Sequence, residues 1–239
     1  MTDSIIIESK ALSSINYFAG LSPENLEELK KYLSPRTIEK GELFMLEGDW
    51  SDSLYFVISG VVKVYKISAD GKEQIMNIAT HGESLNDVST FDQSPTSSNM
   101  IAMTPALLYG IKKNDLSDII LKYPQVAINA LKVLASRVRR NALLVETLSF
   151  NQVTGRLARV LLKHYGENRI PDIRLTQQDM ADMIGTSREM VNKSLKIMEN
   201  DGTIMLKRDG IEIVDKKALE DMSVIRITHP KQEDNPGEV

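Results

Sequence analysis

The chain has 239 residues, of which 42% are hydrophobic and none is cysteine. This hydrophobic fraction supports a folded core, and the lack of cysteine excludes disulfides, thiol redox sensing, cysteine-ligated iron–sulfur clusters and thiol nucleophiles. The net charge of −4 is unevenly distributed: residues 1–136 carry 12 basic and 17 acidic side chains, whereas residues 137–208 carry 13 basic and 8 acidic ones. The second segment therefore has the positive charge that favours contact with phosphate groups.

Several classes of protein are not expected from the sequence. No apolar run approaches the roughly 20 residues that a membrane helix needs, and the first residues lack the pattern of a signal peptide, so we expect a cytoplasmic protein that does not contact a membrane. We find no phosphate-binding loop, no activated serine motif and no clustered metal ligands among the three histidines. We therefore expect no enzymatic activity, no metal and no assigned cofactor.

The first predicted elements are a short helix and then a series of short strands. Leucines recur at helical spacing over residues 23–33. From about Arg36 to Ile111, β-branched runs alternate with glycine-containing turns. Asp70-Gly71 is the dipeptide expected in a tight hairpin between the runs Val61–Ile67 and Glu73–Ile78. Several short strands at this spacing predict an antiparallel roll or barrel.

A long helix is predicted next. Asn114 is expected to cap a helix that ends near Tyr123-Pro124, and a helical pattern then extends from Gln125 to Leu148. Its apolar residues alternate at the three- and four-residue spacing of a coiled-coil seam, and one asparagine would fix the register. The predicted seam consists of Leu131, Leu134, Val138, Asn141, Val145 and Leu148. A narrow apolar stripe usually needs a partner, so we expect a homodimer, and a helix packed on its own domain is the alternative.

The last predicted elements form a small unit. After a helix over Val153–Tyr165, Thr176 is a typical N-cap of a short helix, Gly185 supplies the left-handed residue of a sharp turn, and Ser187 caps a second helix that ends at Asn200. Two strands separated by a turn follow: Thr203–Lys207 and Ile211–Val214. This order of elements predicts a winged helix-turn-helix.

Polar side chains occupy the outward face of the second helix of this pair. Arg188 can donate two hydrogen bonds to a guanine, and Glu189 can accept one from a cytosine amine. An ordinary solvated helix face is the alternative, but the surrounding caps, turn and hairpin favour DNA binding. The candidate DNA contacts are Thr176, Gln177, Ser187, Arg188, Glu189, Asn192, Lys193 and Lys196.

Three segments resemble the CRP/FNR family of bacterial transcription regulators: KGELFMLEGDWSDSLYFVISGVVKVYK, LSFNQVTGRLARVLL and LTQQDMADMIGTSREMVNKSLKIMENDG. The resemblance extends from about Leu21 to Leu219. It implies a jelly-roll sensor domain of the cyclic-nucleotide-binding type, a dimer along the long helix, contact with RNA polymerase, and palindromic DNA with half-sites about 34 Å apart. Lys193 stands where the cyclic-AMP-receptor branch has arginine, which leaves the base that it contacts open.

The sensor domain differs from the cyclic-AMP receptors that the chain resembles. In those proteins a Gly-Glu pair and an Arg-Ser pair hold the ligand, and the arginine binds the phosphate. Ser97 stands at the arginine position here. A buried cyclic phosphate would lack a cation, so we do not expect cyclic AMP held in the usual way. Candidate effector-binding residues are Asn86, Asp87, Val88, Ser97, Ser98, Asn99, Arg137 and Asn141. Another small molecule, a haem bound through His81, or no ligand are the alternatives.

These observations predict an α+β chain of four parts. Residues 1–124 form an effector-sensing β-roll, 125–150 a dimerisation helix, 151–229 a winged helix-turn-helix domain, and 230–239 a disordered tail. The predicted function is a dimeric, sequence-specific DNA-binding transcription regulator with a small-molecule effector other than conventionally bound cyclic AMP. A constitutive regulator, in which the β-roll is only a dimer scaffold, is the second hypothesis. The effector, the target genes and the direction of regulation stay open.

Overall fold

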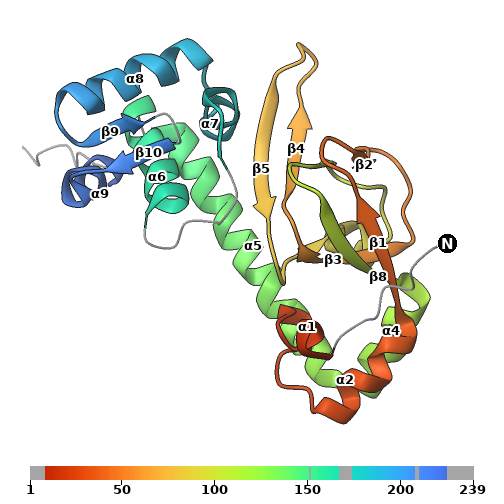
Figure 1. The fold of residues 1–239 in the computed structure, drawn as a ribbon. Helices are drawn as coiled ribbons and strands as arrows, with labels where there is room; N and C mark the ends of the chain where they lie inside the picture. Colours follow the sequence, from red (N-terminus) through yellow and green to blue (C-terminus); the bar gives the residue numbers. More distant parts are fainter. Residues whose placement is uncertain (1–8, 151, 167–173, 208–209, 225–239) are drawn as a thin grey trace, which may run out of the picture.

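The computed structural model describes residues 9–150, 152–166, 174–207 and 210–224. A β-roll, a long helix and a small helical unit follow one another along the chain (Figure 1). The predicted tail, residues 230–239, lies outside the described residues, and so do residues 208–209 of the predicted turn between the last two strands.

The β-roll consists of two four-stranded sheets whose paired strands are antiparallel, with the orders β1-β8-β3-β6 and β2-β7-β4-β5. The strands are β1 (Leu33–Ile38), β2 (Leu43–Met45), β3 (Ser53–Ser59), β4 (Val62–Ile67), β5 (Glu73–Ala79), β6 (Ser84–Leu85), β7 (Asn99–Ala102) and β8 (Ala106–Lys112). Buried side chains from both sheets, such as Val57 and Val62, share one apolar cluster. The predicted antiparallel roll is confirmed, and β4 and β5 are joined across Asp70-Gly71, with Ile67 opposite Glu73.

Short helices accompany the roll. They are α1 (Ser9–Ser13), α2 (Pro23–Leu29), α3 (Asp87–Asp92) and α4 (Lys113–Lys122), with 3-10 turns at Asn16–Phe18 and Lys30–Tyr32. The helix expected over residues 23–33 ends early, because the chain passes through the second 3-10 turn into β1. The predicted cap Asn114 is wrong: Lys112 is the N-cap of α4. β8 runs directly into this helix, and the Lys113 amide donates to the Asp52 carbonyl at 2.7 Å, which fixes its start.

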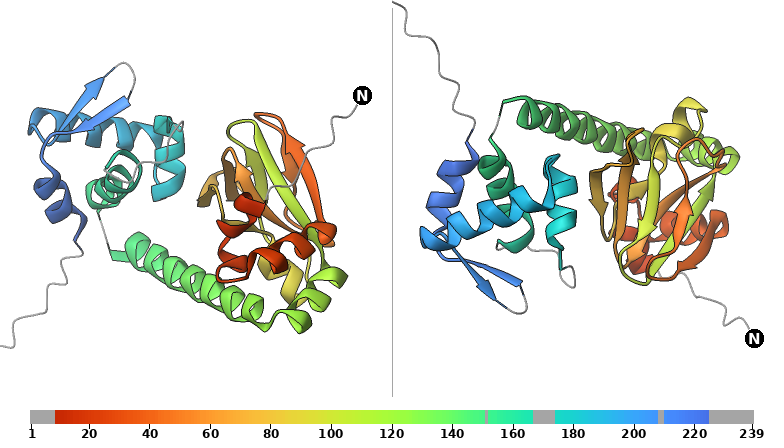
Figure 2. Two further views of the ribbon diagram at one scale, coloured as in Figure 1. Left: turned by 60° about the horizontal axis from the view of Figure 1, so that its bottom comes forward. Right: turned by 90° about the horizontal axis from the view of Figure 1, so that it is seen from above.

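Helix α5 (Pro124–Phe150) connects the two units of the chain. Its 27 residues span about 40 Å at 1.5 Å per residue. Both views in Figure 2 show the β-roll and the helical unit on the same side of α5. Val126 and Ala130, near its first end, are buried in a cluster with the short helices and the roll. Within the described ranges, no helix combines the length and apolar character that a membrane span requires.

The carboxy-terminal unit contains four helices and a hairpin in its described ranges. They are α6 (Val153–Tyr165), α7 (Gln177–Ile184), α8 (Arg188–Asn200), β9 (Ile204–Lys207), β10 (Gly210–Ile213) and α9 (Lys216–Ser223). β9 and β10 pair antiparallel, so the predicted winged helix-turn-helix is confirmed. The apolar faces of α6, α7 and α8 meet in one cluster that includes Leu157, Met180 and Leu195.

The hairpin of β4 and β5 lies against the carboxy-terminal unit. Ile75 and Ile78 of β5 belong to the same apolar cluster as Met180 of α7. Gln74 also donates from Nε2 to the carbonyl of Met183 at 3.2 Å. The sensor hairpin and the helix-turn-helix therefore share one core.

Candidate DNA-binding surface and effector pocket

The first helix of the helix-turn-helix, α7, begins with a capping box. The Thr176 hydroxyl accepts a hydrogen bond from the Asp179 amide at 3.0 Å, and the Asp179 carboxylate accepts one from the Thr176 amide at 2.9 Å. Two amides that the helix start leaves without partners are satisfied in this way. Gly185 ends the helix with φ of 63°, a left-handed conformation that glycine adopts without strain. The predicted cap and turn are both confirmed.

Helix α8 begins at the next cap. The Ser187 hydroxyl accepts from the Met190 amide at 3.3 Å, and Val191, Leu195 and Met198 are buried beneath the helix. These inward residues recur at intervals of four and three positions, and Ser194 is buried beside them, so the exposed polar positions of α8 lie on the opposite, outward face. The start of α8 is thus fixed by its cap, and its orientation by its apolar face.

The outward face of α8 carries side chains suited to DNA. Arg188, Glu189, Lys193 and Lys196 are exposed, and Asn192 is partly exposed. Among the described residues, none of the three cations has an acidic partner within 4.0 Å. Glu189 lies in the first turn, where a carboxylate also stabilises the helix dipole. The surface is therefore open to a ligand that offers both phosphates and base edges.

The two remaining candidate DNA contacts lie at the start of α7. Thr176 is exposed, but its hydroxyl is engaged in the capping box, and Gln177 is partly exposed. A capped helix start presents backbone amides, which suits a phosphate. We therefore expect the contacts to bases to come from α8.

The seam predicted on α5 is largely exposed in the single chain. Leu131 is 63% exposed, Val138 68% and Val145 64%. Leu134 and Leu148 are partly buried, and Asn141 is exposed. Large apolar side chains at this exposure along one helix are typical of a surface that another protein covers.

A pocket of about 180 Å³ lies between the roll and α5. We call it the inner pocket. It is lined by residues of β4, β5, β6, α3, β7 and α5, among them seven of the eight predicted effector contacts: Asn86, Asp87, Val88, Ser97, Ser98, Arg137 and Asn141. The eighth, Asn99, does not line it. Ser98 and Met100 face the pocket, so the residue between them faces away, and its Oδ1 accepts from the Glu47 amide at 3.0 Å.

Asp87 is the central charge of the inner pocket. It is 0% exposed and forms an ion pair with Arg137 of α5. The Tyr17 hydroxyl donates to its carboxylate at 3.2 Å, and the Ser84 hydroxyl donates at 2.9 Å. Burial, followed by the nearby charge of Asp87, raises the pKa of Tyr17, which keeps this donor protonated. The carboxylate is therefore fully engaged by groups of the same chain.

Two arginine side chains that line the inner pocket have N–H donors without a hydrogen-bond partner in the described part of the chain. The Nε atoms of Arg137 and Arg140 are buried and have no hydrogen-bond partner among the described residues. Arg140 lies 3.7 Å from the Glu83 carboxylate, a loose ion pair. Buried donors without acceptors are unfavourable, so an anion in this pocket would complete their hydrogen bonds.

The backbone at Asn86 explains how Asp87 reaches the pocket. Asn86 has φ of 66°, in the left-handed region that asparagine tolerates better than most residues. Its side chain donates to the Ser53 carbonyl at 3.1 Å, which holds this conformation. Sequence reasoning missed Tyr17 and Ser84, since no local pattern links them to Asp87. His81 is exposed, contacts the Ile58 carbonyl at 2.7 Å, and is not among the lining residues.

Comparison with known proteins gives two family matches. The family model described as "Cyclic nucleotide-binding domain" matches residues 35–123, and the one described as "Crp-like helix-turn-helix domain" matches residues 155–222. The chain is 31% identical over 215 residues to the CRP-like cAMP-activated global transcriptional regulator of Mycobacterium tuberculosis, covering 87% of this chain and 96% of that protein. It is 28% identical over 206 residues to the cyclic AMP receptor protein of Thermus thermophilus, covering 86% and 95%.

A solved structure supports the fold. The structure of FixK2 from Bradyrhizobium japonicum matches with a TM-score of 0.72 and 19% identity, covering 80% of this chain and 98% of that one. At this identity the likeness concerns the arrangement of roll, long helix and helix-turn-helix, and not the ligand.

Proposed function

The chain belongs to the CRP/FNR family of transcription regulators, and on that premise we propose that it acts as a homodimer whose binding to palindromic DNA responds to an effector other than conventionally bound cyclic AMP. It is a DNA-binding regulator and not an enzyme. The observation that carries the proposal is the inner pocket, where Asp87 and Arg137 bind each other and the neutral Ser97 stands at the position of the phosphate-binding arginine of the cyclic-AMP receptors. We expect it to work in the cytoplasm, beside promoter DNA and RNA polymerase.

The exposed seam of α5 supports the dimer. Leu131, Val138 and Val145 are each more than half exposed, and burying one such side chain stabilises an interface by roughly 1.5–3 kcal/mol. A second copy related by a two-fold axis would cover the same seam with the same residues. It would also place two α8 helices where they can contact two half-sites about 34 Å apart.

The dimer is tested by sedimentation velocity with two glutamate variants. Val138→Glu places a charge on the proposed seam and should convert the dimer to a monomer. Leu121→Glu changes a side chain of α4 that is 80% exposed and lies off the seam, and it should remain dimeric. A parent protein that sediments as a monomer, or a dimer that survives Val138→Glu, would contradict the proposal.

The chemistry of the inner pocket favours a small organic anion as the effector. Arg137 and Arg140 have buried Nε donors that find no acceptor in the described part of the chain, and a carboxylate accepts from guanidinium in a favourable planar geometry. A cyclic nucleotide would meet the buried carboxylate of Asp87 and no arginine at position 97. The pocket, at about 180 Å³, is also smaller than the roughly 300 Å³ at which ligand pockets usually begin.

The same pocket supports a second candidate function, a constitutive regulator. The Asp87–Arg137 ion pair joins α3 to α5 in the lining of the pocket, so the chain itself can hold the roll and α5 together without a ligand. In that case the DNA affinity would not change with any metabolite. Relatives named as cAMP-activated make cyclic AMP the necessary comparison in the experiment.

Thermal melting and DNA binding in the same buffers distinguish these possibilities. The probes are succinate as a small organic anion, cyclic AMP, and inorganic phosphate. Succinate should raise the melting temperature and change the DNA affinity of the parent, and should do neither for Arg140→Gln. Unchanged melting and DNA affinity with every probe would establish the constitutive alternative. A large stabilisation by cyclic AMP would overturn the proposal about the ligand.

A further inference from the structure

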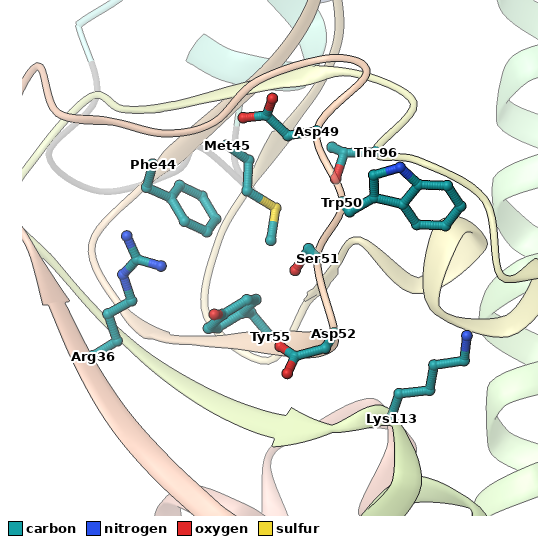
Figure 3. Close-up of a pocket in the computed structure, with 10 residues that line it drawn as sticks. All are labelled: Arg36, Phe44, Met45, Asp49, Trp50, Ser51, Asp52, Tyr55, Thr96 and Lys113. Carbon is teal, nitrogen blue, oxygen red and sulfur yellow. The ribbon is translucent and has the colours of Figure 1, made fainter.

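A second cavity opens on the β-roll and shares no lining residue with the inner pocket. We call it the outer cavity; its walls include Arg36, Phe44, Trp50, Tyr55 and Lys113 (Figure 3). They come from β1, β2, the loop between β2 and β3, β3 and the start of α4. Its volume of about 440 Å³ lies within the roughly 300–1,000 Å³ of small-molecule sites. None of the effector predictions falls in it.

Aromatic rings form two sides of the outer cavity. Phe44 and Tyr55 pack edge to face with centroids 5.7 Å apart. Trp50 stands apart from them on the opposite side, as Figure 3 shows, and is 75% exposed. A tryptophan with this exposure offers a large flat apolar surface that a ring can cover.

The cations of the outer cavity lack anionic partners. Arg36 lies over the rings of Phe44 and Tyr55, at 5.2 Å and 5.9 Å from their centroids. In the part of the chain that the structure describes, neither its guanidinium nor the Lys113 ammonium has an acidic group within 4.0 Å or a side-chain hydrogen bond. Both cations are partly buried. Guanidinium donors held over aromatic rings and without acceptors favour an anion.

Two carboxylates limit the negative charge of a ligand that the outer cavity can bind. Asp49 and Asp52 also line the outer cavity, but both residues are exposed, so water solvates them. They leave the cavity neutral overall, which disfavours a doubly charged phosphate more than a single carboxylate. The planar guanidinium of Arg36 also matches a carboxylate, which it can bind through two parallel hydrogen bonds.

We propose that the outer cavity is a second ligand site that binds a small aromatic monocarboxylate. Arg36 holds the carboxylate, the ring of the ligand lies against Trp50, and Lys113 adds positive potential. This site is separate from the effector pocket of the proposed function, so either can fail without the other.

The outer cavity adjoins the segment that carries the inner pocket. Thr96 lines the outer cavity, and its amide donates to the Asp49 carbonyl at 2.7 Å. Its hydroxyl donates to Oδ1 of Asn86 at 3.4 Å, and Asn86 lines the inner pocket. A ligand that orders the loop around Asp49 therefore acts on a residue bonded directly to the wall of the other pocket.

Tryptophan fluorescence tests the site directly, because Trp50 is the only tryptophan of the chain. Benzoate is the probe, with benzamide as its neutral analogue and phenyl phosphate as its dianionic one. Benzoate should change the emission saturably, and the other two should bind at least about tenfold more weakly, since a charge-assisted hydrogen bond contributes about 1.5–3 kcal/mol. No saturable change with benzoate, or equal binding of benzamide, overturns the proposal.

Matched variants locate the binding. Arg36→Gln keeps the fluorescent reporter and should weaken benzoate binding at least about tenfold. Lys40→Gln removes an exposed cation of the neighbouring turn and should leave the binding unchanged, as should Arg140→Gln in the inner pocket. Circular dichroism melting verifies that each variant is folded. If Arg36→Gln binds benzoate like Lys40→Gln does, or if Arg140→Gln loses binding, the site is not the outer cavity.

Discussion

The outward face of α8 and the inner pocket differ in the exposure and the ion pairing of their charged side chains. On α8, Arg188, Lys193 and Lys196 are exposed and form no ion pair with a described residue. In the inner pocket, Asp87 is fully buried and bound to Arg137. The first region offers solvated side chains to a partner, whereas the second already has its carboxylate bound within the chain.

This difference separates binding from regulation in physical terms. A recognition helix with solvated side chains loses little when DNA arrives, so its affinity depends on the contacts that it gains. In the inner pocket the carboxylate of Asp87 is already bound, so an effector is selected by what it offers to the donors that have no partner among the described residues, the Nε atoms of Arg137 and Arg140.

The largest effect is expected from Arg137→Ala, which leaves the buried Asp87 carboxylate without its cation. Breaking one side of a buried pair costs about 3–5 kcal/mol of unfolding free energy. Arg139→Ala, an exposed position on the same helix, should change stability by less than about 0.5 kcal/mol. Urea unfolding measures both, and equal stabilities would show that the pair does not hold α5 against the roll.

On α8, Arg188→Ala should lower the affinity for specific DNA by about 1–3 kcal/mol and relax the preference at one base pair. Lys217→Ala, an exposed cation of α9, serves as the control and should keep the full preference. Gel-shift titrations against a palindromic site and a scrambled one give both quantities. Retention of the preference in Arg188→Ala would reassign the base contact.

His164 of α6 is a buried polar side chain of the DNA-binding unit. Its ring nitrogens have no partner among the described residues. Burial, and then the charge of Lys163, lowers the pKa of His164 to about 4. In the unfolded chain the pKa of a histidine is about 6.5, so the unfolded chain binds the proton more tightly than the folded one. The stability that neutral His164 contributes is therefore complete above pH 6.5 and is lost as the pH falls toward 4, by roughly 2 kcal/mol.

Urea unfolding between pH 7 and pH 4.5 measures this loss. The variant His164→Leu should flatten the slope of stability against pH. His81→Gln, which changes an exposed histidine, should leave the slope as it is in the parent. An unchanged slope in His164→Leu would mean that other groups govern the acid sensitivity.

A gain of affinity, and not a loss, is expected from Ser97→Arg, which places a cation at the position that binds phosphate in the cyclic-AMP receptors. It should tighten cyclic AMP binding by at least about tenfold, since one charge-assisted hydrogen bond to phosphate contributes about 1.5–3 kcal/mol. Ser136→Arg adds the same charge at an exposed position of α5 and should have no such effect. Calorimetry with cyclic AMP distinguishes them, and tight binding by the parent would contradict the argument from Ser97.

The structural features that can be predicted well from the sequence are those formed by residues close together in the chain. Thr176, Gly185 and Ser187 act on residues within three or four positions, so caps and turn follow from the chain itself. The inner pocket is only partly predictable, because Tyr17 and Asp87 lie 70 residues apart. Asn99 is not among the lining residues, and which side of β7 faces the pocket depends on the pairing of β7 with β4, which the sequence of β7 does not give. The outer cavity draws on six elements and loops that are spread from Arg36 to Lys113, and none carries a recognisable motif.

The contact between the sensor hairpin and α7 limits how this regulator can be recombined. Gln74 binds the Met183 carbonyl, and Ile75 and Ile78 of the hairpin complete the core beneath Met180. A chimaera that joins this helix-turn-helix to another sensor would replace the hairpin and leave that part of the core uncovered. A chimaera that keeps this core intact therefore has to transfer β4 and β5 together with the DNA-binding unit.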